Sequence, residues 1–168
     1  GSSTVTWDFI KNGSLTSDQK KYLPCVVVDG INDAGVAVNI NIVPNDPAKT
    51  YIGNTEGDLS SQCVVRYVLD NAGSVEEAIT LLGKRVVRQS IVGIAGDQTH
   101  YMISDPKETA VVEFINKEMK VTRYTSQNDG FYSPKGNPAI MTNMYDYAIE
   151  QYGFGNEDMF DEYPYGMG

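Results

Sequence analysis

The chain has 168 residues and a formal net charge of −9, with 22 acidic and 13 basic side chains. Such a surface repels phosphate backbones, and the sequence has no basic stripe and no aromatic platform flanked by Lys and Arg, so no nucleic-acid partner is expected. No apolar run approaches the roughly 18 residues that a transmembrane helix needs, so no membrane partner is expected either.

The length and the lack of internal repeats predict one domain spanning residues 1–168, in which residues 1–3 resemble the remnant of an added tag. The two cysteines, Cys25 and Cys63, do not form the framework of a small disulfide-rich secreted domain, so a reducing, cytoplasmic location is expected. One histidine and two distant cysteines give no convergent ligand set. We therefore expect no metal site and no cofactor.

The turn residues and the alternation of apolar and polar residues predict the elements of the first quarter of the chain. Residues 4–24 are polar with little periodicity and predict a strand remnant followed by a loop. The β-branched run at residues 25–28, the turn residues after it and the alternation over residues 36–43 predict a β-hairpin.

The second strand of this hairpin has two different faces. Its even-numbered residues from Val36 to Ile42 are apolar, whereas Asn39 and Asn41 lie on the other face. Periodicity alone favours two amides that face water on a half-exposed strand. The alternative interpretation is a sheet that lines a polar cleft.

Two helices follow the hairpin. Asp58 is a candidate N-cap for a helix that runs to about Asn71. Ser74 with Glu77 three residues later forms a capping box, which predicts a second helix that ends at Gly83.

The rest of the chain returns to strands. The β-rich segments predict an antiparallel meander at residues 86–94, 100–104, 110–115 and 119–124. A loop over residues 126–138 precedes a short strand (139–143) and a helix that begins over residues 145–151. The absence of a βαβ rhythm predicts an α+β fold in which helices pack on an antiparallel sheet. The glycines at residues 93–96 have the spacing of no nucleotide-binding loop, and a turn is favoured.

His100 is the only candidate base in a thiol-based site. It can serve Cys25 or Cys63 in principle, as in papain-like proteases, but neither cysteine has the local signature of such a nucleophile. A structural role is favoured for His100, and both cysteines are interpreted as inert small hydrophobic residues.

Five segments, in matching order, resemble motifs of the choloylglycine hydrolase family, which includes bile salt hydrolases and penicillin V acylases. Residues 27–38 (VVDGINDAGVAV) resemble the family's DGMNEKGL hairpin. The remaining segments are similar to SVEEA, to HWMISD with VVE, and to MTN; they lie at residues 75–78, 100–105, 111–113 and 141–143. The agreement in order makes chance similarity a poor explanation.

The resemblance implies an N-terminal-nucleophile fold, a four-layer αββα sandwich of which this chain would form a part. In that fold a processed first-residue cysteine attacks a linear amide, and its own α-amine acts as the base. The implied partner is a small-molecule amide that is bile-salt-like, penicillin-like or an acyl amino acid. No histidine and no cofactor is required.

The resemblance also implies the residues of an oxyanion site, which needs at least two hydrogen-bond donors. Asn143 corresponds to the asparagine whose side-chain amide supplies the first donor. The second donor precedes a proline that aligns with Pro44, and counting without a gap gives Ile42, whereas an offset of one residue gives Asn41. If Ile42 holds this position, only its backbone N–H can serve.

The family's cysteine nucleophile, with the Arg and Asp that follow it, precedes the hairpin, and a further Arg follows the TN motif. We therefore expect the chain to be an internal fragment that is inactive alone and forms homo-oligomers through strand edges or apolar patches. The alternative is a non-catalytic binding or assembly module derived from the same fold.

Overall fold

The computed structural model describes residues 17–25, 27–43, 56–88, 98–115, 118–127, 130–134, 136, 139 and 141. Six strands form an antiparallel sheet in the order β1-β2-β5-β6-β7-β8. Their bounds are β1 Asp29–Ile31, β2 Ala37–Val43, β5 Gln98–Ser104, β6 Glu108–Ile115, β7 Glu118–Gln127 and β8 Gly130–Tyr132. Strands β3 (Leu59–Ser60) and β4 (Val87–Arg88) form a separate parallel pair. The predicted α+β class is confirmed.

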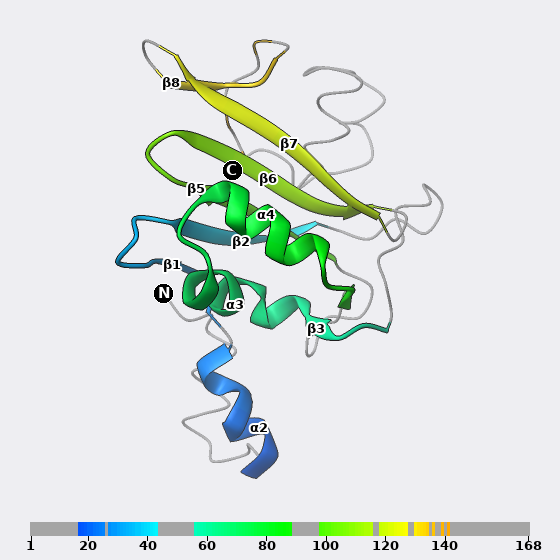
Figure 1. Ribbon diagram of the computed structural model, residues 1–168. Coiled ribbons are helices and arrows are strands. Elements are labelled where there is room, and N and C mark those ends of the chain that lie inside the picture. The colour runs from blue at the N-terminus through cyan, green and yellow to red at the C-terminus, as the bar shows by residue number, and fades with distance from the viewer. Residues whose placement is uncertain are drawn as a thin grey trace.

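Helices α3 (Val64–Asn71) and α4 (Val75–Gly83) lie side by side against one face of the six-stranded sheet (Figure 1). Both helices turn apolar residues toward the sheet, and these side chains pack with alternate residues of β2, β5 and β6. The fully buried members include Val64, Val65, Val68, Val75, Ala78, Leu82, Val36, Tyr101, Ile103 and Val112. The helices and one sheet face therefore share a single core.

The predicted hairpin is confirmed, but its first strand begins four residues later than expected. Residues 23–25 form a short 3-10 helix, η1 (Leu23–Cys25), and β1 pairs with β2 with Gly30 opposite Val38. The turn is set by Asn32, whose Oδ1 accepts the N–H of Val36 at 2.9 Å. Because Asn32 places the turn after residue 31, residues 29 and 30 extend the strand instead of turning.

Asn32 also joins this hairpin to the helix layer. Its Nδ2 donates to the carbonyl oxygens of Leu69 at 3.0 Å and Ala72 at 2.8 Å, at the C-terminal end of α3. Carbonyl groups in the last turn of a helix have no partner within the helix, so this side chain supplies one from outside. One amide thus fixes the hairpin turn and the end of α3 together.

The segment at residues 4–24 was expected to end in a loop, and its described part is helical instead. Helix α2 spans Ser17–Tyr22 and leads directly into η1. Lys20 and Lys21 lie in its last turn, where positive charge is favourable at the negative end of the helix dipole.

The assignment of Asp58 as a helix N-cap is wrong. Its carboxylate accepts the backbone N–H of Val86 at 2.8 Å and pairs with Arg85 at 3.1 Å, which joins the start of β3 to β4. These hydrogen bonds hold the pKa of Asp58 below its ordinary value. The helix begins later, since β3 and a 3-10 turn, η3 (Ser61–Cys63), come before α3. Its predicted end at Asn71 is confirmed.

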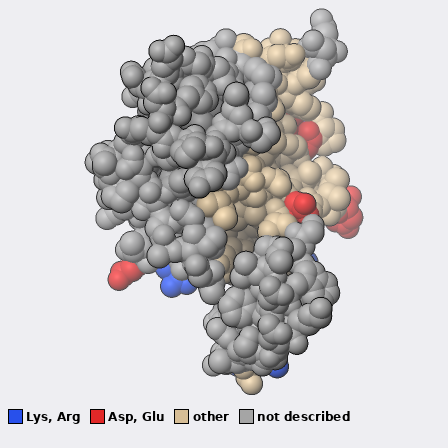
Figure 2. Space-filling view, turned by 180° about the vertical axis from the view of Figure 1, so that it is seen from behind, with Lys and Arg blue, Asp and Glu red and all other residues tan. Residues whose placement is uncertain are grey.

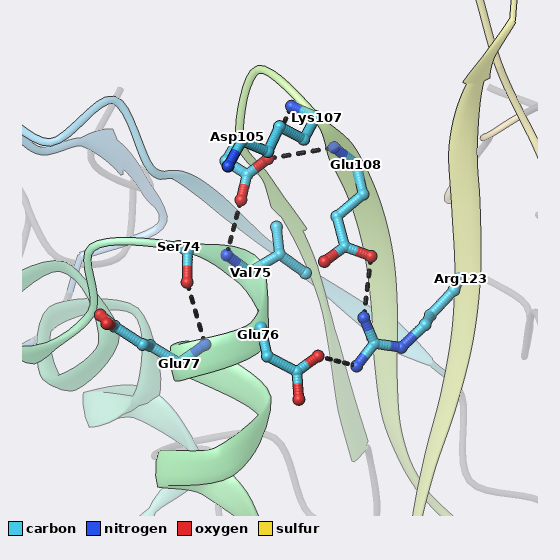
Figure 3. Close-up of polar contacts among 8 residues, drawn as sticks. All are labelled: Ser74, Val75, Glu76, Glu77, Asp105, Lys107, Glu108 and Arg123. Carbon is cyan, nitrogen blue, oxygen red and sulfur yellow. Dashed lines mark hydrogen bonds and ion pairs between the residues drawn. The ribbon is translucent and has the colours of Figure 1, made fainter.

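Helix α4 agrees with its prediction. The Ser74 hydroxyl accepts the N–H of Glu77 at 3.2 Å (Figure 3). The Glu77 carboxylate accepts the N–H of Gly73 at 2.7 Å, so it reaches one residue further back than the standard capping box. The helix ends at Gly83 as expected.

The meander is confirmed for β5, β6 and β7, but the predicted strand at residues 86–94 is wrong as its first member. Only Val87 and Arg88 form a described strand, and they pair with β3 outside the main sheet. The segment at residues 126–138 was expected to be a loop and contains β8. The glycine segment at residues 93–96 and the helix from residue 145 lie outside the described residues, as does most of the strand expected at residues 139–143.

The N-terminal end of α4 is held to the sheet by the β5–β6 turn. Asp105 accepts the N–H of Val75 at 2.9 Å, and within its own turn it accepts the N–H groups of Lys107 at 2.7 Å and Glu108 at 3.0 Å (Figure 3). Arg123 of β7 lies between Glu108 and Glu76 and so connects β6, β7 and α4. Burial acts to raise the pKa of Asp105, but the three backbone donors together hold it below its ordinary value.

Replacing Asp105 by Asn is expected to lower the free energy of unfolding by about 1–2 kcal/mol at neutral pH, because a charged acceptor at a helix N-terminus is lost. The folded-state pKa of Asp105 is depressed, so its contribution is present above the unfolded pKa and is lost as the pH falls through the folded pKa. Urea unfolding at neutral and acidic pH measures the contribution of Asp105 to the free energy of unfolding. The free energies of unfolding of the wild type and of Asp105→Asn should become equal in acid. A difference that grows as the pH falls would contradict the role of the Asp105 carboxylate as an acceptor at the start of α4.

The control for this experiment is Asp70→Asn. Asp70 pairs with Arg66 on the exposed side of α3, with side-chain exposures of 46% and 53%. Its loss should change stability by less than about 0.5 kcal/mol.

Candidate functional site

The sheet face away from the helices carries a row of polar side chains across four neighbouring strands. Asn41 of β2 is paired with His100 of β5, and Glu113 of β6 is paired with Lys120 of β7. His100 Nδ1 lies 3.1 Å from Glu113 Oε1, which joins the two pairs. We call Asn41, His100, Glu113 and Lys120 the polar row.

The centre of the polar row is buried and its ends are not. His100 and Glu113 are both 0% exposed. Asn41 is half-buried, and Lys120, which pairs with Glu118 at 2.6 Å, is 32% exposed. A carboxylate is stable in such a place only when it is hydrogen-bonded or paired, and the imidazole of His100 supplies this contact.

Figure 2 shows the molecule from the side away from α3 and α4, where charged side chains of both signs lie mainly at the margin of the described surface.

The alternation predicted for β2 is confirmed. Val36 and Val38 are buried against the helices, and Ile40 packs on the same core. On the other face Asn39 is exposed, as a water-facing amide would be, whereas Asn41 is half-buried beside His100. The two predicted amides thus have different environments, and only Asn41 belongs to the polar row.

The backbone direction of Ile42 follows from the ladder. Ile40 donates its N–H to Val28 at 3.0 Å, so its N–H points toward the β1 side of β2. N–H groups of alternate residues point the same way, and the N–H of Ile42 therefore also points to that side, beyond Val28. Asn41 directs its backbone toward β5 and its side chain away from the helices. The two candidates for the second donor thus offer groups that point in different directions.

Asn143, the candidate for the first donor, lies outside the described residues. Its role as the first oxyanion donor stays a prediction.

A dyad of Cys63 with His100 is excluded by the sides of the sheet on which these two residues lie. Tyr101 turns its side chain toward the helices, where its hydroxyl donates to the carbonyl oxygen of Ser61 at 2.7 Å. The Cys63 thiol is close enough to Tyr101 to affect its pKa, which burial raises well above its usual range. His100 follows Thr99 and precedes Tyr101 on β5, so it points to the opposite face. It cannot act as a base for Cys63.

The two cysteines are far apart in sequence but meet in space. Cys25 at the end of η1 forms a hydrogen bond with Cys63 next to α3. Burial raises the pKa of the Cys63 thiol to about 11, and the contact with Cys25 adds to the rise. This environment agrees with the interpretation of Cys63 as a weak nucleophile.

Cys63 should therefore react slowly with iodoacetamide. With a pKa of about 11, fewer than about one Cys63 thiol in a thousand is ionised at neutral pH, and the rate should rise about tenfold per pH unit into the alkaline range. Mass spectrometry of the peptide that contains Cys63 measures this rate separately from that of Cys25. Alkylation at neutral pH as fast as that of free cysteine would contradict the assignment.

Glu113 is the residue of this face that the sequence interpretation did not assign. The β5–β6 turn is closed by Asp105 N–H bonded to the Glu108 carbonyl, and residues equidistant from it pair across the hairpin, as Tyr101 does with Val112. Counting one step further from the turn places His100 opposite Glu113. The turn position was the signal that could have identified this pair.

Within the described ranges, no three His, Cys, Asp or Glu side chains come together as a metal site would require. No described helix is both long and apolar enough to cross a bilayer.

Comparison with known proteins places the chain in a family. The model of the family described as acyl-coenzyme A:6-aminopenicillanic acid acyl-transferase matches residues 15–147. No curated protein matches the chain. This family lies in the N-terminal-nucleophile hydrolase superfamily and is related to the choloylglycine hydrolases, so the superfamily expected from the sequence motifs is confirmed. Because the match covers well over half of its length, the chain belongs to the acyl-coenzyme A:6-aminopenicillanic acid acyl-transferase family.

Proposed function

We propose that this chain is part of a cysteine-dependent N-terminal-nucleophile enzyme that cleaves linear amide C–N bonds. The observation that carries the proposal is the family match over residues 15–147. The described fold supports it, because α3 and α4 cover one face of the antiparallel sheet (Figure 1) and the opposite face bears the polar row. In the αββα sandwich that we propose, this second face would lie toward the other sheet.

The proposed reaction is acyl transfer through a thioester. The thiolate of a leading cysteine attacks the amide carbonyl, the C–N bond breaks, and the leaving amine takes a proton from the α-ammonium group of the same cysteine. Water then hydrolyses the thioester, which releases the acid and restores the thiol. Negative charge develops on the carbonyl oxygen in both steps, so two fixed donors are required.

We assign these donors to Asn143 and to the segment Asn41–Ile42. The side-chain amide of Asn143 is the proposed first donor. The second is either the side chain of Asn41 or the backbone N–H of Ile42, and these two groups point in different directions from β2. The proposed substrates are bile-salt-like, penicillin-like or acyl-amino-acid amides.

A second candidate function follows from the description of the matched family. Acyl transfer from a coenzyme A thioester to the amine of 6-aminopenicillanic acid uses the same acyl-enzyme, with an amine in place of water as the acceptor. The ratio of acid to new amide formed in the presence of an amine acceptor distinguishes hydrolase from transferase.

The test uses the protein encoded by the complete reading frame. N-terminal sequencing should show a leading cysteine, and the purified protein should hydrolyse phenoxymethylpenicillin, glycocholate or an N-acyl amino acid. Serine in place of that cysteine should abolish turnover. A complete reading frame without a leading cysteine, together with binding of these amides but no turnover, would instead favour the non-catalytic module.

A further inference from the structure

The polar row contains a buried pair that the proposed acyl-transfer chemistry does not use. We propose that His100, held by Glu113, is a positioning residue that fixes the Asn41–Ile42 segment of β2 for its role as oxyanion donor. This inference rests on the proposed function. It adds His100 and Glu113, which act on the Asn41–Ile42 segment from the neighbouring strands of the sheet.

His100 is placed to act on this segment by the register of the sheet. Asn41 and His100 are direct partners across β2 and β5, and Ile42 is opposite Thr99. Side chains of directly opposed residues share a face, with Cβ atoms about 4.5–5.5 Å apart. The Cβ atoms of His100 and Asn41 are therefore neighbours on the face of the sheet away from the helices.

Glu113 fixes the orientation of that imidazole. Its Oε1 lies 3.1 Å from His100 Nδ1, and both side chains are 0% exposed. Rotation of the ring would separate a buried carboxylate from this partner, which is unfavourable. With Nδ1 directed to β6, the proposed action of His100 on β2 would be exerted through the other ring nitrogen, Nε2.

The packing of the sheet does not by itself require a polar pair at this position. Val111, which lies two residues from Glu113 on the same face of β6, is apolar and 0% exposed. Well-packed apolar residues in place of a buried ion pair are often neutral or stabilising. A buried imidazole and carboxylate next to the donor segment therefore indicate a role in orientation.

The test compares two substitutions of His100 in the complete protein. In His100→Asn the side-chain amide can replace the contact of Nδ1 with Glu113 but not Nε2, whereas in His100→Gln it reaches the position of Nε2 but not that of Nδ1. Phenoxymethylpenicillin hydrolysis gives kcat and KM, and thermal unfolding gives stability. We expect His100→Asn to lower kcat about tenfold or more, with KM changed less than about twofold and little change in Tm, and His100→Gln to retain more of kcat but to lower Tm, because it loses the contact with Glu113.

The matched control is Val112→Ala, which removes volume from the helix-facing side of β6 next to Glu113. It should lower Tm without changing kcat below the unfolding transition. His100→Asn with wild-type kcat, or His100 variants whose kcat falls only in proportion to the loss of folded protein, would overturn the positioning role.

An NMR measurement tests the same role without turnover. The side-chain amide resonances of Asn41 should shift, and their exchange with water should become faster, in His100→Asn but not in Val112→Ala. Unchanged Asn41 resonances overturn the inference. A wild-type protein that hydrolyses none of the three amides overturns the proposed function instead, so the two failures can be distinguished.

Discussion

His100→Leu is expected to lower the free energy of unfolding by about 3–5 kcal/mol, because it removes the imidazole that pairs with the fully buried carboxylate of Glu113. The cost arises from the carboxylate that remains in the protein interior without this contact. Chemical denaturation of the wild type and the variant at neutral pH measures the difference.

The double variant His100→Leu with Glu113→Leu should recover most of this loss, since neither side chain then needs polar solvation. The exposed pair of Arg66 and Asp70 provides a control, and Arg66→Leu should cost less than about 1 kcal/mol. A loss below about 1 kcal/mol for His100→Leu would mean that the buried contact contributes no more than an exposed pair.

Asn143→Ala in the complete protein is expected to lower kcat by about 10²–10³-fold, the usual effect of removing one oxyanion donor. Substrate binding should change little, because the charge on the oxygen develops only in the transition state. Steady-state hydrolysis of phenoxymethylpenicillin measures both constants. A kcat within about threefold of the wild type would remove Asn143 from the proposed mechanism.

The same assay decides between the two candidates for the second donor. Asn41→Ala should lower kcat by about 10²–10³-fold if the side chain is the donor, and far less if the backbone N–H of Ile42 is. Asn39→Ala is the matched control, because Asn39 has the same amide on the same face of β2 but is exposed. Equal effects of the two alanine variants would show that neither amide acts as a donor.

Local signals predicted those elements whose hydrogen bonds are themselves local. Helix α4 follows from Ser74 and Glu77, which are three residues apart and bond as expected. Asp58 carries the same N-cap signal, but its carboxylate bonds to Val86, a residue 28 positions away. A single sequence does not contain that competing contact, so the start of α3 was placed too early.

In the candidate site, too, local features could be predicted from the sequence and long-range features could not. The alternation of β2 predicted which face bears Asn39 and Asn41, but it could not show that Asn41 is half-buried and Asn39 exposed. That difference depends on the strands beside β2, and the order of strands in a sheet is a long-range property. The pairing of His100 with Glu113 was within reach, because it needs only the position of the β5–β6 turn.

The double role of Asn32 has a mechanical consequence for the donor segment. A single amide is bonded at once to the hairpin turn and to the last carbonyl groups of α3, so β2 cannot slide along its neighbours without also disrupting the helix. The strand that carries Asn41 and Ile42 is thereby tied at its N-terminal end to the helix layer. The proposed donor segment would then be held in place before a substrate binds, so that the substrate adapts to the protein.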